Sequence, residues 1–141
     1  MSTVFLDTAP LIYLVEGTAD LRQLVRLRLS EWIDADVPLR SSVLTLAELL
    51  VPAKKAGDVR RVYQYKTALR ELLGGPLHGI DEHQAERAAE IRAQYGFSSP
   101  DALQLASAQA MGCDVFFTND RQLRKFKEIE IILVTGLACC E

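Results

Sequence analysis

The sequence predicts an α/β fold in three layers, α/β/α, with a central, mainly parallel sheet of about five strands between two layers of helices. Short apolar runs rich in β-branched and aromatic residues alternate with longer segments that have helical spacing. Capping residues and glycines separate these segments. Strands that alternate with helices form parallel sheets, and helices then cover both faces.

Five segments have the composition of strands, because they are short, apolar and bounded by Gly, Pro or polar residues. They are 3–6, 37–42, 76–80, 114–118 and 129–134. Capping residues and apolar spacing place the helices between them, with Thr8, Asp81 and Ser99 as expected caps. Helices are expected after Thr8, over 20–32, over 45–53, from Asp58 to the glycines at 74–75, over 82–95 and from Pro100 to Met111.

The composition limits the functional classes. The chain has 141 residues, of which 49% are hydrophobic and 25% charged, so we expect one globular domain over 1–141. The net charge of −3 and the pI near 5.4 exclude a polycationic surface. Any contact with nucleic acid must therefore be local.

Neither a membrane segment nor a disulfide framework is expected. No apolar run approaches the roughly 20 residues of a membrane-spanning helix, and MSTVFLDTAP lacks the order of a signal peptide. Cys113, Cys139 and Cys140 are odd in number and lack metal-ligand spacing, so we expect reduced thiols. We expect a cytoplasmic protein.

Three aspartates occupy positions where a site is expected. In open parallel sheets, sites form beyond the carboxyl ends of the strands, where Asp7 and Asp120 lie, and Asp101 lies in the first turn of its helix. Each also has a structural explanation, because carboxylates cap helices or stabilise a helix N-terminus by about 0.3–1 kcal/mol. One such residue alone indicates no function.

Glu48 is different, because it lies inside the apolar stretch LTLAELLV, where no helix terminus needs a carboxylate. An unpaired charge is costly there, so either a Lys or Arg from another helix or a bound cation must balance it. If the four acids converge, repulsion of several kcal/mol at about 4 Å favours proton uptake or a divalent ion. Mg²⁺ or Mn²⁺ suits an all-oxygen site.

Other chemistries are poorly supported. His78 and His83 lack acidic or cysteine neighbours at a ligand spacing, and no G-x-S-x-G, P-loop or dinucleotide motif is present. A phosphatase of the haloacid dehalogenase type needs a second acid two residues after the first, where Ala9 stands. Receiver modules need an acidic pair near the first strand and a lysine after a late strand, which the sequence lacks.

Three segments together resemble the PIN-domain nucleases, in particular their VapC-type toxin branch. They are FLDTAPLIYLVE (5–16), SSVLTLAELL (41–50) and DALQLASAQAMGCDVFFTND (101–120), and a final apolar strand follows them. The resemblance spans nearly the whole chain in the family's order. Gln104 stands where relatives often have histidine, and the tail GLACCE has no motif that we can interpret.

The resemblance implies an acidic quartet that holds one or two Mg²⁺ or Mn²⁺ ions and hydrolyses RNA phosphodiester bonds, leaving a 5′-phosphate and a 3′-hydroxyl. The quartet is matched here by Asp7, Glu48, Asp101 and Asp120. Glu48 binds metal, holds a metal-bound water or orients the attacking water. Thr8 and Thr118 match supporting hydroxyl positions, and Asn119 either supports the site or contacts metal or water.

The resemblance also implies partners: an RNA substrate, a separate VapB-like antitoxin and a second copy of the chain. The homodimer interface is expected in LIYLVE or in the helix from Asp58. RNA needs positive charge near the acids, and the alternative for each cation is a solvated helix face. The candidate RNA contacts are Lys54, Lys55, Arg60, Arg61, Arg121, Arg124 and Lys125. The remaining alternative function is a PIN-type domain that binds RNA or serves as a scaffold without cutting.

Overall fold

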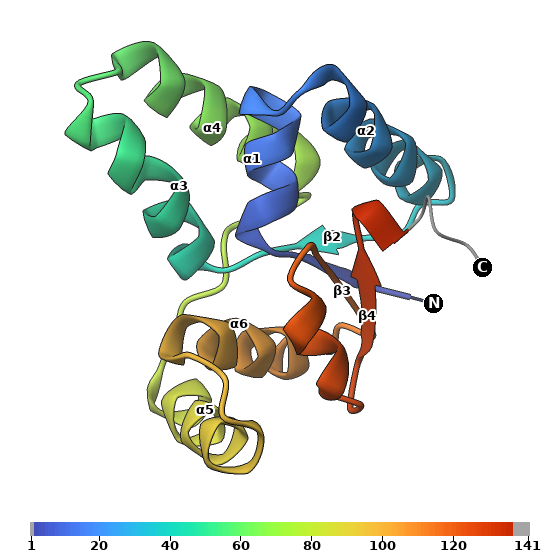
Figure 1. The fold of residues 1–141 in the computed structure, drawn as a ribbon, viewed down its shortest axis with the longest axis vertical. Helices are drawn as coiled ribbons and strands as arrows, with labels where there is room; N and C mark the ends of the chain where they lie inside the picture. The colour runs from blue at the N-terminus through green and yellow to red at the C-terminus, as the bar shows by residue number, and fades with distance from the viewer. Residues whose placement is uncertain (1, 137–141) are drawn as a thin grey trace.

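The computed structural model describes residues 2–136 and has the predicted three-layer α/β architecture (Figure 1). All strand pairs in its sheet are parallel, and the order across the sheet is β2-β1-β3-β4. Val4 of the central strand β1 pairs with Leu39 on one side and with Val115 on the other. The strands are β1 (Val4–Leu6), β2 (Leu39–Arg40), β3 (Val115–Thr118) and β4 (Glu130–Leu133).

The segment 76–80, which we predicted as a fifth strand, joins the sheet at one point only. His78 forms a parallel bridge with Ser42. The His78 N–H donates to the carbonyl of Ser41 at 3.0 Å, and the His78 carbonyl accepts from the N–H of Val43 at 2.9 Å. Pro76 has no N–H to donate to a ladder, so the pairing does not extend toward it.

Six helices and one 3-10 helix connect the strands in residues 2–136. They are α1 (Thr8–Glu16), α2 (Ala19–Asp34), α3 (Val43–Lys55), α4 (Val59–Leu72), α5 (Glu82–Tyr95), α6 (Ser99–Ala110) and η1 (Arg121–Lys125). Asp81 caps α5, as predicted, and forms a capping box with Gln84. Two predicted caps are wrong by one residue, because Asp7 caps α1 in place of Thr8 and Ser98 caps α6 in place of Ser99. Asp7 and Ser98 have the extended backbone of a cap, whereas Thr8 and Ser99 are already helical.

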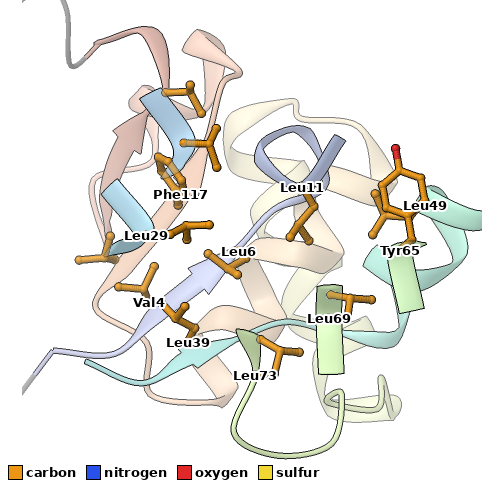
Figure 2. Close-up of a cluster of buried hydrophobic side chains, with 13 residues drawn as sticks. Val4, Leu6, Leu11, Leu29, Leu39, Leu49, Tyr65, Leu69, Leu73 and Phe117 are labelled. Carbon is orange, nitrogen blue, oxygen red and sulfur yellow. The ribbon is translucent and has the colours of Figure 1, made fainter. Parts of the chain in front are cut away.

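Each face of the sheet has its own apolar core. Leu6 and Phe117 point into the core that α1–α4 cover, shown in Figure 2. Phe5 and Phe116 point the other way, stack with ring centroids 5.1 Å apart and pack against α5 and α6. Side chains alternate between the two faces of a strand, so neighbouring residues serve opposite cores. Helices α3 and α6 therefore belong to opposite layers (Figure 1).

The strand order creates a crevice between β1 and β3. The chain leaves β1 for β2 on one side of the sheet and returns to β3 on the other side of β1. Ligand sites in open α/β sheets form at such switch points, beyond the carboxyl ends of the strands. Asp7 follows β1 here, and Asn119 and Asp120 follow β3.

The described residues also bear on the expectations for membrane segments, thiols and apolar surfaces. In residues 2–136 no helix has the length and apolar character needed to cross a bilayer. Cys113 is a buried free thiol, and Cys139 and Cys140 lie outside the described residues. Leu11 of LIYLVE is buried, whereas Val59 and Tyr63 of α4 are 80% and 67% exposed.

Candidate active site

One open cavity at the carboxyl ends of β1 and β3 brings together the four predicted acids. Its volume is about 700 Å³. The acids come from the end of β1, from α3, from α6 and from the residue before η1, so they are distant in sequence. The lining residues are Asp7, Thr8, Ala9, Ile12, Tyr13, Glu48, Asp101, Thr118, Asn119, Asp120, Arg121 and Gln122.

Asp7 is fixed by hydrogen bonds to both of its carboxylate oxygens. Oδ1 accepts from the N–H of Thr8 at 2.8 Å, which is the capping bond of α1. Oδ2 accepts from the Oγ1 hydroxyl of the buried Thr118 at 2.7 Å. Asp7 therefore caps a helix and also faces the cavity, so its structural and its site interpretation are compatible.

The environment of Asp7 disfavours its charged form. Burial raises the pKa of Asp7 from 3.8 to about 6, although the hydrogen bonds from Thr118 and Thr8 oppose the shift. The charges of Asp101 and Glu48 raise it further, which indicates that these carboxylates interact across the cavity. A carboxyl group that titrates near neutral pH in a cleft is typical of a functional site.

Glu48 is half-buried, and the residue that holds it is Thr8. The Thr8 hydroxyl donates to Oε1 of Glu48 at 2.5 Å. Among residues 2–136, no ion pair includes Glu48, so the lysine or arginine that we considered as its partner is absent there. Thr8 thus connects two acids, because its N–H binds Asp7 and its hydroxyl binds Glu48.

Asp101 and Asp120 lie at the starts of two helical segments. The N–H of Asp101 donates to the Ser98 hydroxyl at 3.3 Å. Burial raises the pKa of Asp101, and the charge of Asp120 adds to this while Ser98 opposes it. Asp120 caps η1 by accepting from the N–H of Gln122 at 3.0 Å, and its own N–H donates to Thr118 Oγ1 at 3.2 Å.

The side-chain amide of Asn119 is occupied by structural bonds. Its Oδ1 accepts from the N–H and the hydroxyl of Thr135 at 3.1 and 3.0 Å, and its Nδ2 donates to the Tyr13 hydroxyl at 3.2 Å. Asn119 therefore ties the end of β3 to α1 and to the segment after β4. The Asn119 oxygen that we considered as a possible contact to metal or water thus already accepts two hydrogen bonds.

Tyr13 and Ile12 form an apolar wall of the cavity that sequence reasoning missed. Ile12 follows Ala9 by three residues and Tyr13 follows it by four, so all three lie on one side of α1. The sequence predicts the helix but not which of its sides faces the cavity, since LIYLVE is apolar at most positions. The packing of α1 on β3 and α3 determines it.

The carboxylates share the cavity without forming a closed cage. In the described residues, no group of three acidic, histidine or cysteine side chains is arranged to hold an ion by itself. The hydrogen bonds from Thr8, Thr118 and Gln122 keep the acids at their separate positions. Mg²⁺ commonly takes only one or two carboxylates and completes its octahedral shell with waters and substrate phosphate, so an open oxygen-lined site fits it.

The predicted RNA contacts are not equivalent. Arg121 lines the cavity, and Arg124 and Lys125 are exposed on the same 3-10 helix. Lys54 and Lys55 are exposed in the last turn of α3, and Arg60 is exposed at the start of α4. Arg61 instead pairs with Glu16 and donates to Gln64 at 3.1 Å, so its charge is already balanced.

The chain is thus an α/β protein with a parallel sheet, and four carboxylates line an open cavity at the switch point of that sheet. The model of the PIN domain family matches residues 4–129. The chain therefore belongs to the PIN domain family. A search of curated proteins found no match.

Several solved structures are similar over almost the full chain. A toxin–antitoxin complex from Klebsiella pneumoniae is 25% identical with a TM-score of 0.72, covering 94% of this chain and 98% of that one. VapBC2 from Rickettsia felis, bound to a promoter DNA fragment, is 15% identical with a TM-score of 0.76, covering 93% and 98%. FitAcB from Neisseria gonorrhoeae is 18% identical with a TM-score of 0.70, covering 94% and 98%.

Proposed function

We propose that this chain is a metal-dependent endoribonuclease, the toxin of a type II toxin–antitoxin pair. The observation that carries the proposal is the convergence of Asp7, Glu48, Asp101 and Asp120 on one cavity without a basic partner among the described ion pairs. The family match and the similarity to a solved toxin–antitoxin complex support it.

The donor set favours Mg²⁺ or Mn²⁺, because every acidic ligand offers hard oxygen atoms. Asp7, Asp101 and Asp120 are the proposed main ligands, with Glu48 as a direct ligand or as a holder of water. The raised pKa values of Asp7 and Asp101 support this, because a nearby cation would favour their ionised forms. A divalent ion supplies Lewis-acid stabilisation of the charge that develops on the phosphate.

The residues of the chain would orient the reaction. Thr8 holds Glu48 by Oε1, and Oε2 has no hydrogen bond within residues 2–136, so it is suited to orienting the attacking water. Attack of water on phosphorus with cleavage of the P–O3′ bond gives a 5′-phosphate and a 3′-hydroxyl. Arg121, at the edge of the cavity, is suited to binding an RNA phosphate.

The proposal includes two protein partners. The toxin–antitoxin complex from Klebsiella pneumoniae supports a separate VapB-like antitoxin. We propose that this antitoxin covers the cavity. A homodimer is also proposed, and the exposed Val59 and Tyr63 of α4 provide an apolar surface for it. The exposed Ile12 is the corresponding candidate on α1.

The test is cleavage of RNA by the purified chain with Mg²⁺ or Mn²⁺ and with EDTA. Sequencing of the ends after brief expression in cells would identify the RNA target, with Asp101→Asn as the control. We expect cleavage that needs the metal and is lost in Asp101→Asn. Equal cleavage by the parent chain and Asp101→Asn, or cleavage in EDTA, would reject the proposal of a metal-dependent nuclease at this site. RNA binding without cleavage in any metal would favour the alternative of a scaffolding PIN domain.

A further inference from the structure

Gln104 of α6 is a buried amide whose two ends are bonded to another helix. It is 2% exposed, and its partners Ser42 and Thr45 are fully buried. The Ser42 hydroxyl donates to Oε1 of Gln104 at 2.5 Å, and Nε2 of Gln104 donates to Oγ1 of Thr45 at 2.6 Å. Ser42 is also the cap of α3, where its hydroxyl accepts from the N–H of Leu44. Gln104 is thus bonded to the cap and to the first turn of α3.

This bridge connects the two helical layers. Helix α3 packs on α4 and α1 in one core, whereas α6 packs mainly on α5 in the other. Within residues 2–136, the two bonds of Gln104 are the only side-chain hydrogen bonds between α6 and the segment 42–55. Both layers pack on β1 and β3, and the amide adds a direct polar link between the two helices.

Two acids of the cavity lie one helical turn from this bridge. Glu48 follows Thr45 by three residues in α3, and Asp101 precedes Gln104 by three residues in α6. Residues three apart lie on the same side of a helix, separated by about 4.5 Å along its axis. A shift of α6 relative to α3 would therefore move the Asp101 carboxylate relative to that of Glu48.

We infer that Gln104 is a positioning residue that sets the separation of Glu48 and Asp101 across the two layers. The inference rests on the proposed function, because it concerns the cation that these acids would share. Gln104 itself does not line the cavity. It acts through the turn of α6 between Asp101 and Gln104 and the turn of α3 between Thr45 and Glu48.

The experiment is a double-mutant cycle on the bridge with Mn²⁺ affinity as the readout. Gln104→Met keeps the volume and removes both bonds, and Thr45→Val keeps the shape and removes one. By calorimetric titration with Mn²⁺, we expect Gln104→Met to bind about tenfold more weakly, the usual scale for losing a group that orients a ligand. The double variant should bind no more weakly than Gln104→Met, because the bond is already lost.

Two control variants separate positioning from general destabilisation. Ser107→Ala removes a buried hydroxyl from the same helix that has no hydrogen-bond partner, and Ile91→Val loosens the core beneath α6. Both should keep the Mn²⁺ affinity of the parent chain, although Ile91→Val should lower the melting temperature. Gln104→Met should instead lose Mn²⁺ affinity. That loss cannot come from a lower melting temperature alone, because Ile91→Val is also destabilised and should keep its affinity.

The outcomes distinguish the inference from the proposed function. If the parent chain and Asp101→Asn bind Mn²⁺ equally, the proposed metal site fails and the inference fails with it. If Asp101→Asn loses binding while Gln104→Met and Thr45→Val bind like the parent chain, only the inference is overturned. Should Gln104→Met not fold, Thr45→Val decides alone, and unchanged affinity in that variant rejects the positioning role.

Discussion

The two ends of α1 carry acids that are balanced in opposite ways. Glu16 is the last residue of the helix. It accepts a hydrogen bond from the Tyr65 hydroxyl and forms an ion pair with Arg61. These contacts lower the pKa of Glu16, with the Tyr65 bond as the largest cause. Asp7 caps the start of the same helix, has no basic partner among the ion pairs of residues 2–136, and has a raised pKa.

The difference separates a structural acid from a candidate ligand. Where the chain supplies its own cation, the carboxylate is stabilised in the charged form and links two helices, here α1 and α4. Where hydroxyl and amide groups alone hold the carboxylate, burial and neighbouring acids leave its charge uncompensated. A cation from outside the chain is then the natural partner, which is why the Asp7 end of α1 carries the proposed chemistry.

The largest expected effect is on RNA cleavage. Asp7→Asn should reduce the cleavage rate by about a thousandfold, because several kcal/mol of metal-derived stabilisation are lost. Glu16→Gln, which alters the acid at the other end of α1, should remain within about threefold of the parent chain, since exposed ion pairs contribute little to the fold. Gel-based rates under identical Mg²⁺ concentrations measure both. Comparable losses in the two variants would show that the two ends of α1 do not differ in function.

The second effect is on stability and its dependence on pH. The folded chain holds the Asp7 proton up to about pH 6, whereas the unfolded chain releases it near 3.8. This contribution to stability is full below about pH 4 and is lost as the pH rises through 6. In EDTA at pH 7, Asp7→Asn should therefore be more stable than the parent chain, by at most roughly 3 kcal/mol.

Urea denaturation at pH 4 and pH 7 measures that difference. The difference between variant and parent should shrink at pH 4, where the Asp7 carboxyl is largely protonated in the folded state. Comparing the two proteins at each pH cancels the effect of Glu16 and Asp114, whose lowered pKa values destabilise both proteins in acid. A constant difference between pH 4 and pH 7 would contradict the raised pKa of Asp7.

The third effect concerns the balanced end of α1. Tyr65→Phe removes a buried hydroxyl that donates to a carboxylate, so the free energy of unfolding should fall by about 1.5 kcal/mol. Tyr95→Phe is the matched control, because its hydroxyl meets Glu128 at 3.3 Å in an exposed network. It should change stability by less than about 0.5 kcal/mol. Equal losses of stability in urea denaturation would show that the Tyr65–Glu16 bond contributes no more than the exposed Tyr95–Glu128 bond.

Most of the fold could be predicted from the sequence, because local patterns determine it. The strand at 114–118 and the capping box at Asp81 and Gln84 depend on neighbouring residues only, and both are present. The fifth strand at 76–80 was wrong in extent, since only His78 pairs with the sheet and Pro76 has no N–H to continue the ladder.

The candidate site was predictable as a set of residues but not as a geometry. The resemblance supplied the four acids, and the strand ends gave a reason for Asp7 and Asp120. The resemblance also supplied Thr8 and Asn119 as supporting residues. Their hydrogen-bond partners, Glu48 for the Thr8 hydroxyl and Tyr13 for the Asn119 amide, could not be predicted, because these bonds join segments up to 106 positions apart. Such contacts depend on the packing of α1 between β3 and α3, which no local pattern encodes.

The smallest effect tests whether an unpaired arginine differs from a paired one in binding RNA. Arg121 lines the cavity and has no ion pair in residues 2–136, whereas Arg61 is committed to Glu16. In the Asp101→Asn background, which prevents cleavage, Arg121→Ala should weaken RNA binding a few-fold and reduce the slope of log affinity against log salt by about 1. Arg61→Ala should leave that slope unchanged, because its guanidinium already neutralises a carboxylate of the chain. Fluorescence anisotropy over a salt series measures both slopes, and a lower slope in Arg61→Ala alone would move the RNA path from η1 to α4.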